Sequence, residues 1–416
     1  MTVEELGLLA GAASGILRSA TTETKNAALL AMADSIMARK EVILRANQQD
    51  LEAAAASAIP MVMQDRLLLN ETRLEAVCAA LRHIANLPDP IGAYDRSVKR
   101  PNGLLIGMRR VPLGLVGIIF ESRPNVTVDA AALCIKSGNA CLLRGGKEAI
   151  FTNIALTKAM QAGLAEIGLP GACVSLVEDT SRQSSIDMMN LKGILDVLIP
   201  RGGKGLIRAV VDNARVPVIE TGAGNCHIYV DSTADQDMAT SILVNAKCQR
   251  PSVCNACETL LVAQDIAEEF LPKAAMALKA SGHSVELRGC KRTCAILSTA
   301  HQARDEDWGM EYNDYILAIR VVDDVHHAVS HINRHSTHHS EAIITRDLVA
   351  ADEFIKGVDS AAVYINASTR FTDGEEFGFG GEIGISTQKL HARGPMGLEH
   401  LTTIQYVVQG SGQCRE

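Results

Sequence analysis

Cys254 is the strongest candidate nucleophile in the chain. It lies in residues 249–256 (QRPSVCNA), directly after an apolar helical stretch. A thiol attacks an electrophile only as the thiolate, which needs positive potential and solvent access. Arg250 and the chain break imposed by Pro251 could supply both. The alternative is a buried free cysteine that packs as a small apolar group, and the other features of the chain must decide between them.

Two glycine pairs with basic neighbours follow apolar strand-like runs, in residues 143–148 (LRGGKE) and 200–205 (PRGGKG). Glycines let backbone N–H groups approach an anion at a helix N-terminus, where adjacent Arg and Lys neutralise its charge. Neither loop is a Walker motif or a GxGxxG fingerprint, and one such loop is usually only a turn. Two of them in one sheet favour a dinucleotide site. The candidate cofactor-binding residues are Arg144, Lys147, Arg201, Gly202 and Gly203.

The first of these loops also bears on which dinucleotide binds. Arg144 and Lys147 favour the extra 2′-phosphate of NADPH/NADP over a free ribose hydroxyl. Glu220, between two strand-like runs, could act as a base or simply end a strand, and spacing does not decide. No Gly-x-Ser-x-Gly nucleophile elbow is present, which gives serine hydrolase chemistry little support.

Histidines and further cysteines raise the question of a metal. His327, His331 and His335 recur at helical spacing, but no carboxylate or cysteine with metal-ligand spacing accompanies them. A solvated helix face is the favoured interpretation. A zinc or redox site built from Cys254, Cys257, Cys290 and Cys294 is disfavoured because Cys257 opens a strand-like run. The sequence therefore predicts no metal site.

The elements that must position these residues alternate along the chain. Amphipathic helices come first, over residues 25–55. Short aliphatic runs separated by helical segments then predict parallel sheets with crossover helices. The predicted strands are 115–120, 140–143, 173–177, 195–199, 216–219, 226–230, 258–262, 315–322, 342–345 and 361–365. The predicted later helices are 234–247, 266–280, 325–334 and 349–356.

Composition limits the class of protein. The chain has 416 residues, 47% hydrophobic and 3% aromatic, enough for two or three domains. We expect a cytoplasmic protein, because no apolar run approaches the ~20 residues that span a bilayer and the N-terminus lacks the pattern of a signal peptide. Eleven scattered cysteines suggest reduced thiols. A net charge of -8 disfavours nucleic-acid binding, so an anionic substrate must meet local basic groups.

Two segments fit neither predicted domain. Residues 97–110 and 401–408 are short, partly alternating stretches that could pair as exposed strands. Exposed strands invite a partner subunit. We therefore predict an oligomerisation arm and a homo-oligomer.

The chain resembles the aldehyde dehydrogenase superfamily over nearly its whole length, and within it the gamma-glutamyl phosphate reductase (glutamate-5-semialdehyde dehydrogenase) family. Six blocks carry the resemblance: residues 110–127, 142–148, 198–205, 245–255, 363–373 and 386–397. It implies an α/β fold with two α/β domains that have parallel-type sheets, plus a small β oligomerisation arm. The implied boundaries are 1–95 and 111–228 for the cofactor domain, 229–390 for the catalytic domain, and 96–110 with 391–416 for the arm and C-terminal strand.

The resemblance also implies a reaction. The family reduces L-glutamyl 5-phosphate with NADPH to L-glutamate 5-semialdehyde, the second step from glutamate to proline, which implies a functional link to glutamate 5-kinase. Cys254 would displace phosphate and form a thioester that accepts hydride. Hydrolytic relatives keep a water-activating base where this chain has Glu220. Hydrolysis would waste the thioester here, so Glu220 is expected to be structural or secondary.

Residue roles follow from the same resemblance. Glu311 corresponds to the family carboxylate that holds a cofactor ribose. Where ordinary aldehyde dehydrogenases place an oxyanion-hole asparagine, this chain has residues 122–125 (SRPN), so the donor would be the Cys254 backbone N–H with Arg123 or Asn125. Substrate carboxylate and phosphate need cationic partners. The candidates are Arg123, Arg250, Arg370 and Arg393.

Overall fold

The computed structural model describes residues 1–57, 61–121 and 123–415. The chain forms two compact units, unit 1 (Met1–Thr221, Gly378–Gly384 and Met396–Glu416) and unit 2 (Gly222–Phe377 and Ile385–Pro395). Residues 222–228, expected in the cofactor domain, pack in unit 2, because Gly224 abuts the backbone of Cys254. Residues 378–384, expected in the catalytic domain, pack in unit 1, where Gly380 lies against Leu87.

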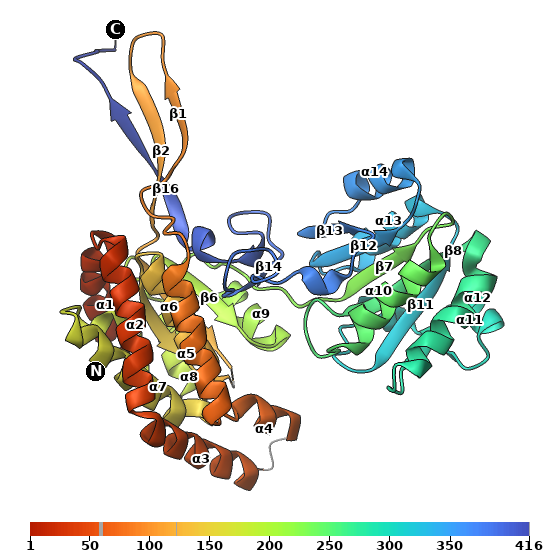
Figure 1. Cartoon of the computed structure of the whole chain (residues 1–416), viewed down its shortest axis with the longest axis horizontal. Helices are drawn as coiled ribbons and strands as arrows, with labels where there is room; N and C mark the ends of the chain where they lie inside the picture. The colour runs from red at the N-terminus through yellow and green to blue at the C-terminus, as the bar shows by residue number, and fades with distance from the viewer. Residues whose placement is uncertain (58–60, 122, 416) are drawn as a thin grey trace. The chain divides into compact units, whose positions relative to one another are not determined.

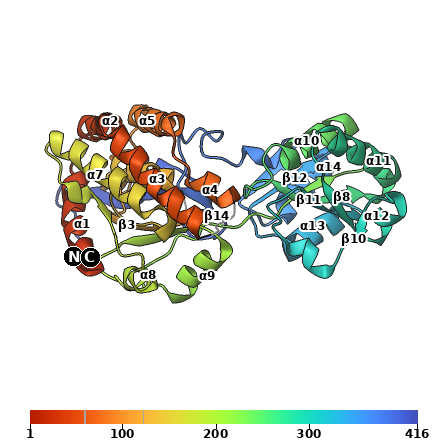
Figure 2. The same cartoon turned by 90° about the horizontal axis from the view of Figure 1, so that it is seen from below.

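Unit 1 contains a four-stranded parallel sheet in the order β5-β4-β3-β6. All six residues of β3 are buried, as expected for a strand covered on both faces. In Figure 2, α8 and α9 lie on the opposite side of this sheet from α2, α5 and α7. The strands are β3 (Leu115–Phe120), β4 (Ala140–Arg144), β5 (Val174–Leu176) and β6 (Val197–Arg201). The helices are α1 (Val3–Arg18), α2 (Thr22–Ala38), α3 (Lys40–Ala56), α4 (Met61–Leu67), α5 (Glu71–Asn86), α6 (Pro124–Lys136), α7 (Ile150–Glu166), α8 (Arg182–Met189) and α9 (Lys204–Asn213).

Unit 2 contains a seven-stranded parallel sheet in the order β10-β9-β11-β8-β7-β12-β13. Successive residues of β8 face opposite sides: Leu260 packs with α10 and α11, and Leu261 packs with α13 and α14. The strands are β7 (Cys226–Val230), β8 (Cys257–Ala263), β9 (Glu286–Gly289), β10 (His301–Gln302), β11 (Ile316–Val322), β12 (Ser340–Ile344) and β13 (Ala362–Ile365). The helices are α10 (Gln236–Cys248), α11 (Gln264–Ala280), α12 (Lys291–Ile296), α13 (Val325–His335) and α14 (Leu348–Gly357).

A third sheet is antiparallel and belongs to unit 1. β1 (Tyr94–Lys99) and β2 (Leu105–Pro112) form a hairpin, and β16 (Thr402–Gln409) pairs with β2 along its whole length. Figure 1 shows the three strands as a ribbon that projects from the helices of unit 1. Residues 97–110 and 401–408, which fitted neither predicted domain, do pair. The first of them is part of a hairpin that begins at Tyr94, and not a single stretch from residue 97. The predicted fold class is confirmed: two α/β units with parallel sheets and a separate small β-sheet.

One predicted strand is absent. Residues 216–219 make only an isolated bridge between Val218 and Leu198. Pro217 lacks an N–H to donate to a ladder. The segment therefore bonds only around Leu198: the Pro217 carbonyl oxygen accepts from the Leu198 N–H at 2.8 Å, and the Ile219 N–H donates to the Leu198 carbonyl oxygen at 3.0 Å. The remaining strands form a two-stranded sheet, β14 (Gly384–Ser386) with β15 (Gly394–Met396). The short 3-10 helices are η1 (Lys147–Ala149), η2 (Gly171–Cys173), η3 (Asp305–Gly309), η4 (Thr369–Phe371) and η5 (Leu398–Leu401). Within the described part of the chain, every helix is too short or too polar to cross a membrane.

Candidate functional site

Cys254 lies in a turn between α10 and β8 and is half-buried, so its side chain is partly open to solvent. The Cys226 thiol donates a hydrogen bond to the Cys254 carbonyl oxygen at 3.2 Å. Gly224 lies against the same carbonyl, since a Cβ added to Gly224 would stand 1.5 Å from that oxygen. Residues 224–226 therefore hold the turn through its backbone, and Cys254 as a whole is only half-buried.

Asn255 fixes the other side of the turn. Its side chain is buried and donates from Nδ2 to the Thr372 carbonyl oxygen at 2.9 Å. The Thr369 hydroxyl donates in return to the Asn255 carbonyl oxygen at 2.7 Å. These two bonds connect the Cys254 turn to η4 and the residue after it. The position of the turn therefore depends on residues more than a hundred positions further along the chain.

Two of the predicted substrate arginines share the surroundings of Cys254. Arg370 donates from Nε to the Gln249 side-chain oxygen at 3.0 Å and from Nη1 to the Asn255 side-chain oxygen. Burial lowers the pKa of Arg370 and the charge of Arg250 lowers it further, whereas Cys254 acts in the opposite direction. Arg370 is therefore electrostatically coupled both to Cys254 and to Arg250. Arg250 is exposed at the start of the turn.

Glu311 also reaches this region. Its carboxylate accepts a hydrogen bond from the Gly224 N–H at 2.9 Å, next to the Cys254 carbonyl. The following segment is fixed by Glu258, which accepts from the Asn313 N–H at 3.0 Å and pairs with buried Lys247 at 2.5 Å. Unit 2 thus brings Glu311 together with the Cys254 turn.

Arg393 is engaged elsewhere in unit 2. Its Nη2 lies 2.9 Å from Asp359, which also binds Lys389 at 2.6 Å. Hydrogen bonds from Lys389 and then Arg393 lower the pKa of Asp359 to about 2. This carboxylate offsets the charge of Arg393 in the structure, and the role of Arg393 toward the substrate stays a prediction.

In unit 1, the second glycine loop already holds an anionic group of the chain itself. The Glu121 carboxylate accepts a hydrogen bond from the Gly203 N–H at 2.8 Å. A Cβ on Gly202 would lie 2.5 Å from the same carboxylate oxygen. Arg201 lies 3.7 Å from Glu382. The Gly203 N–H is the kind of backbone donor that binds anions at the start of a helix, and in this structure the Glu121 carboxylate occupies it.

The first glycine loop is built differently, because groups of the chain itself already occupy its glycine and the amides of the helix that follows it. Asn153 and Phe120 pack against Gly145, where a Cβ would lie 2.1 Å and 3.1 Å from them. The first free amides of α7, including Thr152 N–H at 2.8 Å, donate to buried Asp50. Arg144 donates to the carbonyl oxygens at 180 and 181. Lys147 is the exposed basic group that remains.

The two predicted oxyanion donors lie at the start of α6. Arg123 occupies the N-cap position, and Asn125 donates from Nδ2 to Asp129 at 3.0 Å. Burial raises the pKa of Asp129 to about 6, against the opposing effects of Asn125 and Arg201. Ser122, which precedes them in the matched motif, lies outside the described residues. Glu220 is half-buried in unit 1. The roles of these residues toward Cys254 stay predictions.

Three residues of these sites were missed from the sequence: Gly224, Cys226 and Glu121. In residues 220–225, only Glu220 was predicted to have a role. The Gly-x-Gly pattern there is a feature that can mark a close backbone approach. A buried cysteine such as Cys226 and an exposed glutamate such as Glu121 carry no comparable pattern.

The histidine cluster is a solvated face only in part: the His327 side chain is 60% exposed, whereas His331 is buried. His331 is only 6% exposed and lies between the rings of Trp308 and His335. Burial, followed by the charges of His227 and His335, lowers the pKa of His331 to about 2. Among the residues that the structure describes, no group of three or more His, Cys, Asp or Glu side chains is arranged to hold a metal ion.

His331 should make stability depend on pH. An unfolded chain protonates this histidine near pH 6.5 and the folded chain only near 2, so the unfolded state binds more protons between these values. The free energy of unfolding should therefore fall by about 1 kcal/mol between pH 7.5 and 5.5 from this group alone. Denaturation followed by Trp308 fluorescence measures this free energy at both pH values. Its decrease from pH 7.5 to 5.5 should be smaller in His331→Gln than in the matched exposed variant His326→Gln. Equal pH dependence in both variants would contradict the assignment.

Comparisons with known proteins agree with this architecture. Residues 3–308 match the family described as the aldehyde dehydrogenase family. A gamma-glutamyl phosphate reductase of Clostridium perfringens is 56% identical over 409 residues, covering 98% of each chain. The crystal structure of gamma-glutamyl phosphate reductase from Thermotoga maritima superposes with a TM-score of 0.98 at 47% identity, covering 100% of both chains. An engineered glycolyl-CoA reductase with bound NADP+ shares the fold at 17% identity and a TM-score of 0.69, covering 98% of this chain and 96% of that chain.

The chain belongs to the aldehyde dehydrogenase family. The finer resemblance predicted from the six sequence blocks is confirmed as well, since full-length relatives at 56% and 47% identity are gamma-glutamyl phosphate reductases.

Proposed function

We propose that this protein reduces L-glutamyl 5-phosphate to L-glutamate 5-semialdehyde with release of phosphate, using NADPH, as the second step of proline biosynthesis from glutamate. The observation that carries the proposal is the half-buried Cys254, electrostatically coupled to Arg370. Relatives that match over the whole chain are named for the reduction of gamma-glutamyl phosphate.

Cys254 performs the covalent step in this proposal. Its thiolate attacks the acyl carbon of glutamyl phosphate, a C–S bond forms, and the C–O bond to phosphate breaks with its electron pair leaving on phosphate. Arg250 and Arg370 favour the thiolate by their charge and supply donors for the anionic groups of the substrate. Bound NADPH supplies the hydride that reduces the resulting thioester. Cys254 then leaves as the thiolate when its C–S bond breaks.

Three groups of residues are proposed to bind the cofactor. Arg201, Gly202 and Gly203 meet its phosphates, which requires the Glu121 carboxylate to leave the Gly203 N–H or share it. Glu311 holds a ribose. Lys147 and Arg144 favour the 2′-phosphate of NADPH, and Lys147 is the more exposed of the two. The oxyanion that develops during thioester formation is assigned to the Cys254 backbone N–H with Arg123 or Asn125.

Omission of each reactant tests the proposal. In the oxidative direction, NADP reduction by glutamate 5-semialdehyde should require inorganic phosphate, because phosphate must discharge the thioester. In the forward direction, glutamate 5-kinase with ATP and glutamate should supply the substrate, and NADPH oxidation should depend on the kinase. NADP reduction that proceeds without phosphate would indicate a hydrolytic aldehyde dehydrogenase and overturn the proposal.

We also propose that the β1-β2-β16 sheet is a contact between copies of the chain. β2 is its central strand, so β1 and β16 are both edge strands. β16 carries exposed Tyr406 and Val408, and exposed edge strands favour association. Light scattering at micromolar concentration should give at least twice the mass of one chain. Tyr406→Lys with Val408→Lys should lower that mass, and a monomer before substitution would contradict the proposal.

A further inference from the structure

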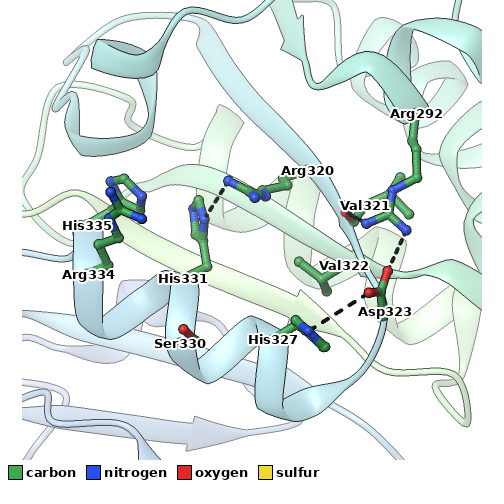
Figure 3. A pocket seen from close by; sticks show the side chains of 10 residues that line it. All are labelled: Arg292, Arg320, Val321, Val322, Asp323, His327, Ser330, His331, Arg334 and His335. Atoms are coloured by element: carbon green, nitrogen blue, oxygen red, sulfur yellow. Dashed lines mark hydrogen bonds and ion pairs between the residues drawn. The ribbon is translucent and has the colours of Figure 1, made fainter.

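Unit 2 contains a polar cavity beside α13, outside the Cys254 turn. Its volume is about 220 Å³, several times the ~30 Å³ that one water occupies in the liquid. Figure 3 shows its lining side chains: His327, His331, Arg334 and His335 come from α13, Arg320 comes from β11, Arg292 comes from α12, and Asp323 precedes α13. The i, i+4 spacing of the histidines places them along one side of the helix.

The positive charge in this cavity is only partly offset. Arg292 is engaged, since its Nη1 lies 2.5 Å from Asp323 and its Nη2 donates to the Val321 carbonyl oxygen at 2.7 Å. Arg320 and Arg334 differ from it. Neither forms an ion pair with any carboxylate in the described ranges of the chain, and the one polar neighbour of Arg320 is the ring of His331, at 3.3 Å. The one carboxylate among the residues that line the cavity, Asp323, pairs with Arg292. Arg320 and Arg334 thus line the cavity without an ion pair of their own among the described residues.

His331 adds a second, independent observation. A guanidinium can only donate, so the His331 Nδ1 that faces Arg320 must accept, and the proton of the neutral ring lies on Nε2. That Nε2 is buried and has no hydrogen-bond partner among the described residues. Buried donors without acceptors are rare in folded proteins. Positive neighbours also contribute to lowering the pKa of this histidine.

We propose that this cavity is a binding site for a small oxyanion of at least two negative charges, with inorganic phosphate as its ligand. Arg320 and Arg334 provide the counter-charge, and the histidines of α13 provide further donors. Guanidinium groups suit phosphate because they offer several donors in one plane. The inference does not rest on the chemistry proposed for Cys254.

The protein contains its own reporter of the site. Trp308 is the single tryptophan of the chain. Its ring lies 5.5 Å from the Arg320 guanidinium carbon and 5.5 Å from the His331 ring. Its intrinsic fluorescence therefore responds to the two side chains that line the cavity, and phosphate bound near Cys254 can be distinguished from phosphate bound here.

The experiment is a titration of the full-length protein with sodium phosphate, with sodium chloride at equal ionic strength as the reference. We expect a saturable change in Trp308 fluorescence that chloride does not reproduce, and about tenfold weaker binding in Arg334→Gln, the loss expected for one charge-assisted contact. Arg304→Gln is the matched control, because Arg304 is 81% exposed, lies four residues from Trp308 and does not line the cavity.

Three outcomes would overturn the proposal: no phosphate-specific change in fluorescence, equal weakening in both variants, or unchanged binding in Arg334→Gln. Glycerol 3-phosphate distinguishes the source of the anion. If it binds at least tenfold more tightly than inorganic phosphate, and Arg334→Gln weakens it, the ligand is a phosphate ester and the assignment to the free ion fails. Thermal denaturation of each variant establishes that it is folded before titration.

Discussion

Replacing Cys254 by serine should lower the rate of NADPH-dependent reduction by on the order of 10³-fold or more. A hydroxyl has nearly the size of a thiol but is far less ionised at neutral pH, so it cannot displace phosphate at a comparable rate. Folding should be largely unaffected, because Cys254 is half-buried and its turn is held by bonds to the Cys254 carbonyl oxygen and to Asn255, which serine keeps. Steady-state rates and thermal denaturation measure the two effects.

Cys290→Ser is the matched control. Cys290 is also half-buried in unit 2, and its pKa is lowered because hydrogen bonds from Thr293 and neighbouring amides outweigh the effect of burial. If ease of ionisation alone selected the nucleophile, this variant would lose activity too. We expect it to keep nearly the full rate. Substantial turnover by Cys254→Ser, or an equal loss in Cys290→Ser, would refute the role of Cys254.

Gly224→Ala should be nearly as damaging, although the residue has no side chain to contribute to chemistry. The added Cβ would stand 1.5 Å from the Cys254 carbonyl oxygen and 2.5 Å from its carbonyl carbon. Both are backbone atoms, so the clash can be relieved only by displacing the Cys254 turn or the residue 224 loop. Displacing a nucleophile by about 1 Å can cost about 10²-fold in rate, and we expect at least that loss together with a lower melting temperature.

Gly15→Ala provides the comparison. Gly15 lies in α1, and a Cβ there would have nothing within 4 Å. Alanine stabilises a helix interior by roughly 0.5–1 kcal/mol relative to glycine, so this variant should keep its activity and melt at the same or a higher temperature. Wild-type rates and stability in Gly224→Ala would show that the close approach is not required.

Much of the fold could be predicted because continuous apolar runs mark parallel strands that are covered on both faces. Residues 115–120 fit this pattern and form β3. Residues 216–219 have a similar composition, yet Pro217 removes one donor and only a bridge forms. The pairing of β16 with β2 joins segments nearly three hundred residues apart, and it could be expected only because both segments lacked a place in the predicted sheets.

The site could be predicted where a local break in the chain marks a residue as accessible. It could not be predicted where a side chain or backbone group is bound by a residue far away in the sequence. The proline-terminated helix before Cys254 is a local feature of the sequence. The pairing of Arg393 with Asp359 and the Glu121 carboxylate at Gly203 are long-range contacts between charged residues, for which a single sequence gives no spacing rule. His331 had the expected helical period, but its burial depends on Trp308 and Arg320 from other elements.

The most direct test of the central claim is to detect the covalent intermediate on Cys254. The enzyme is mixed with glutamate 5-semialdehyde and NADP without phosphate, quenched in acid, digested, and analysed by mass spectrometry. The account predicts a glutamyl adduct on the peptide that contains Cys254, and its loss when inorganic phosphate is added before the quench. An adduct on a different residue, or one that phosphate does not discharge, would contradict it.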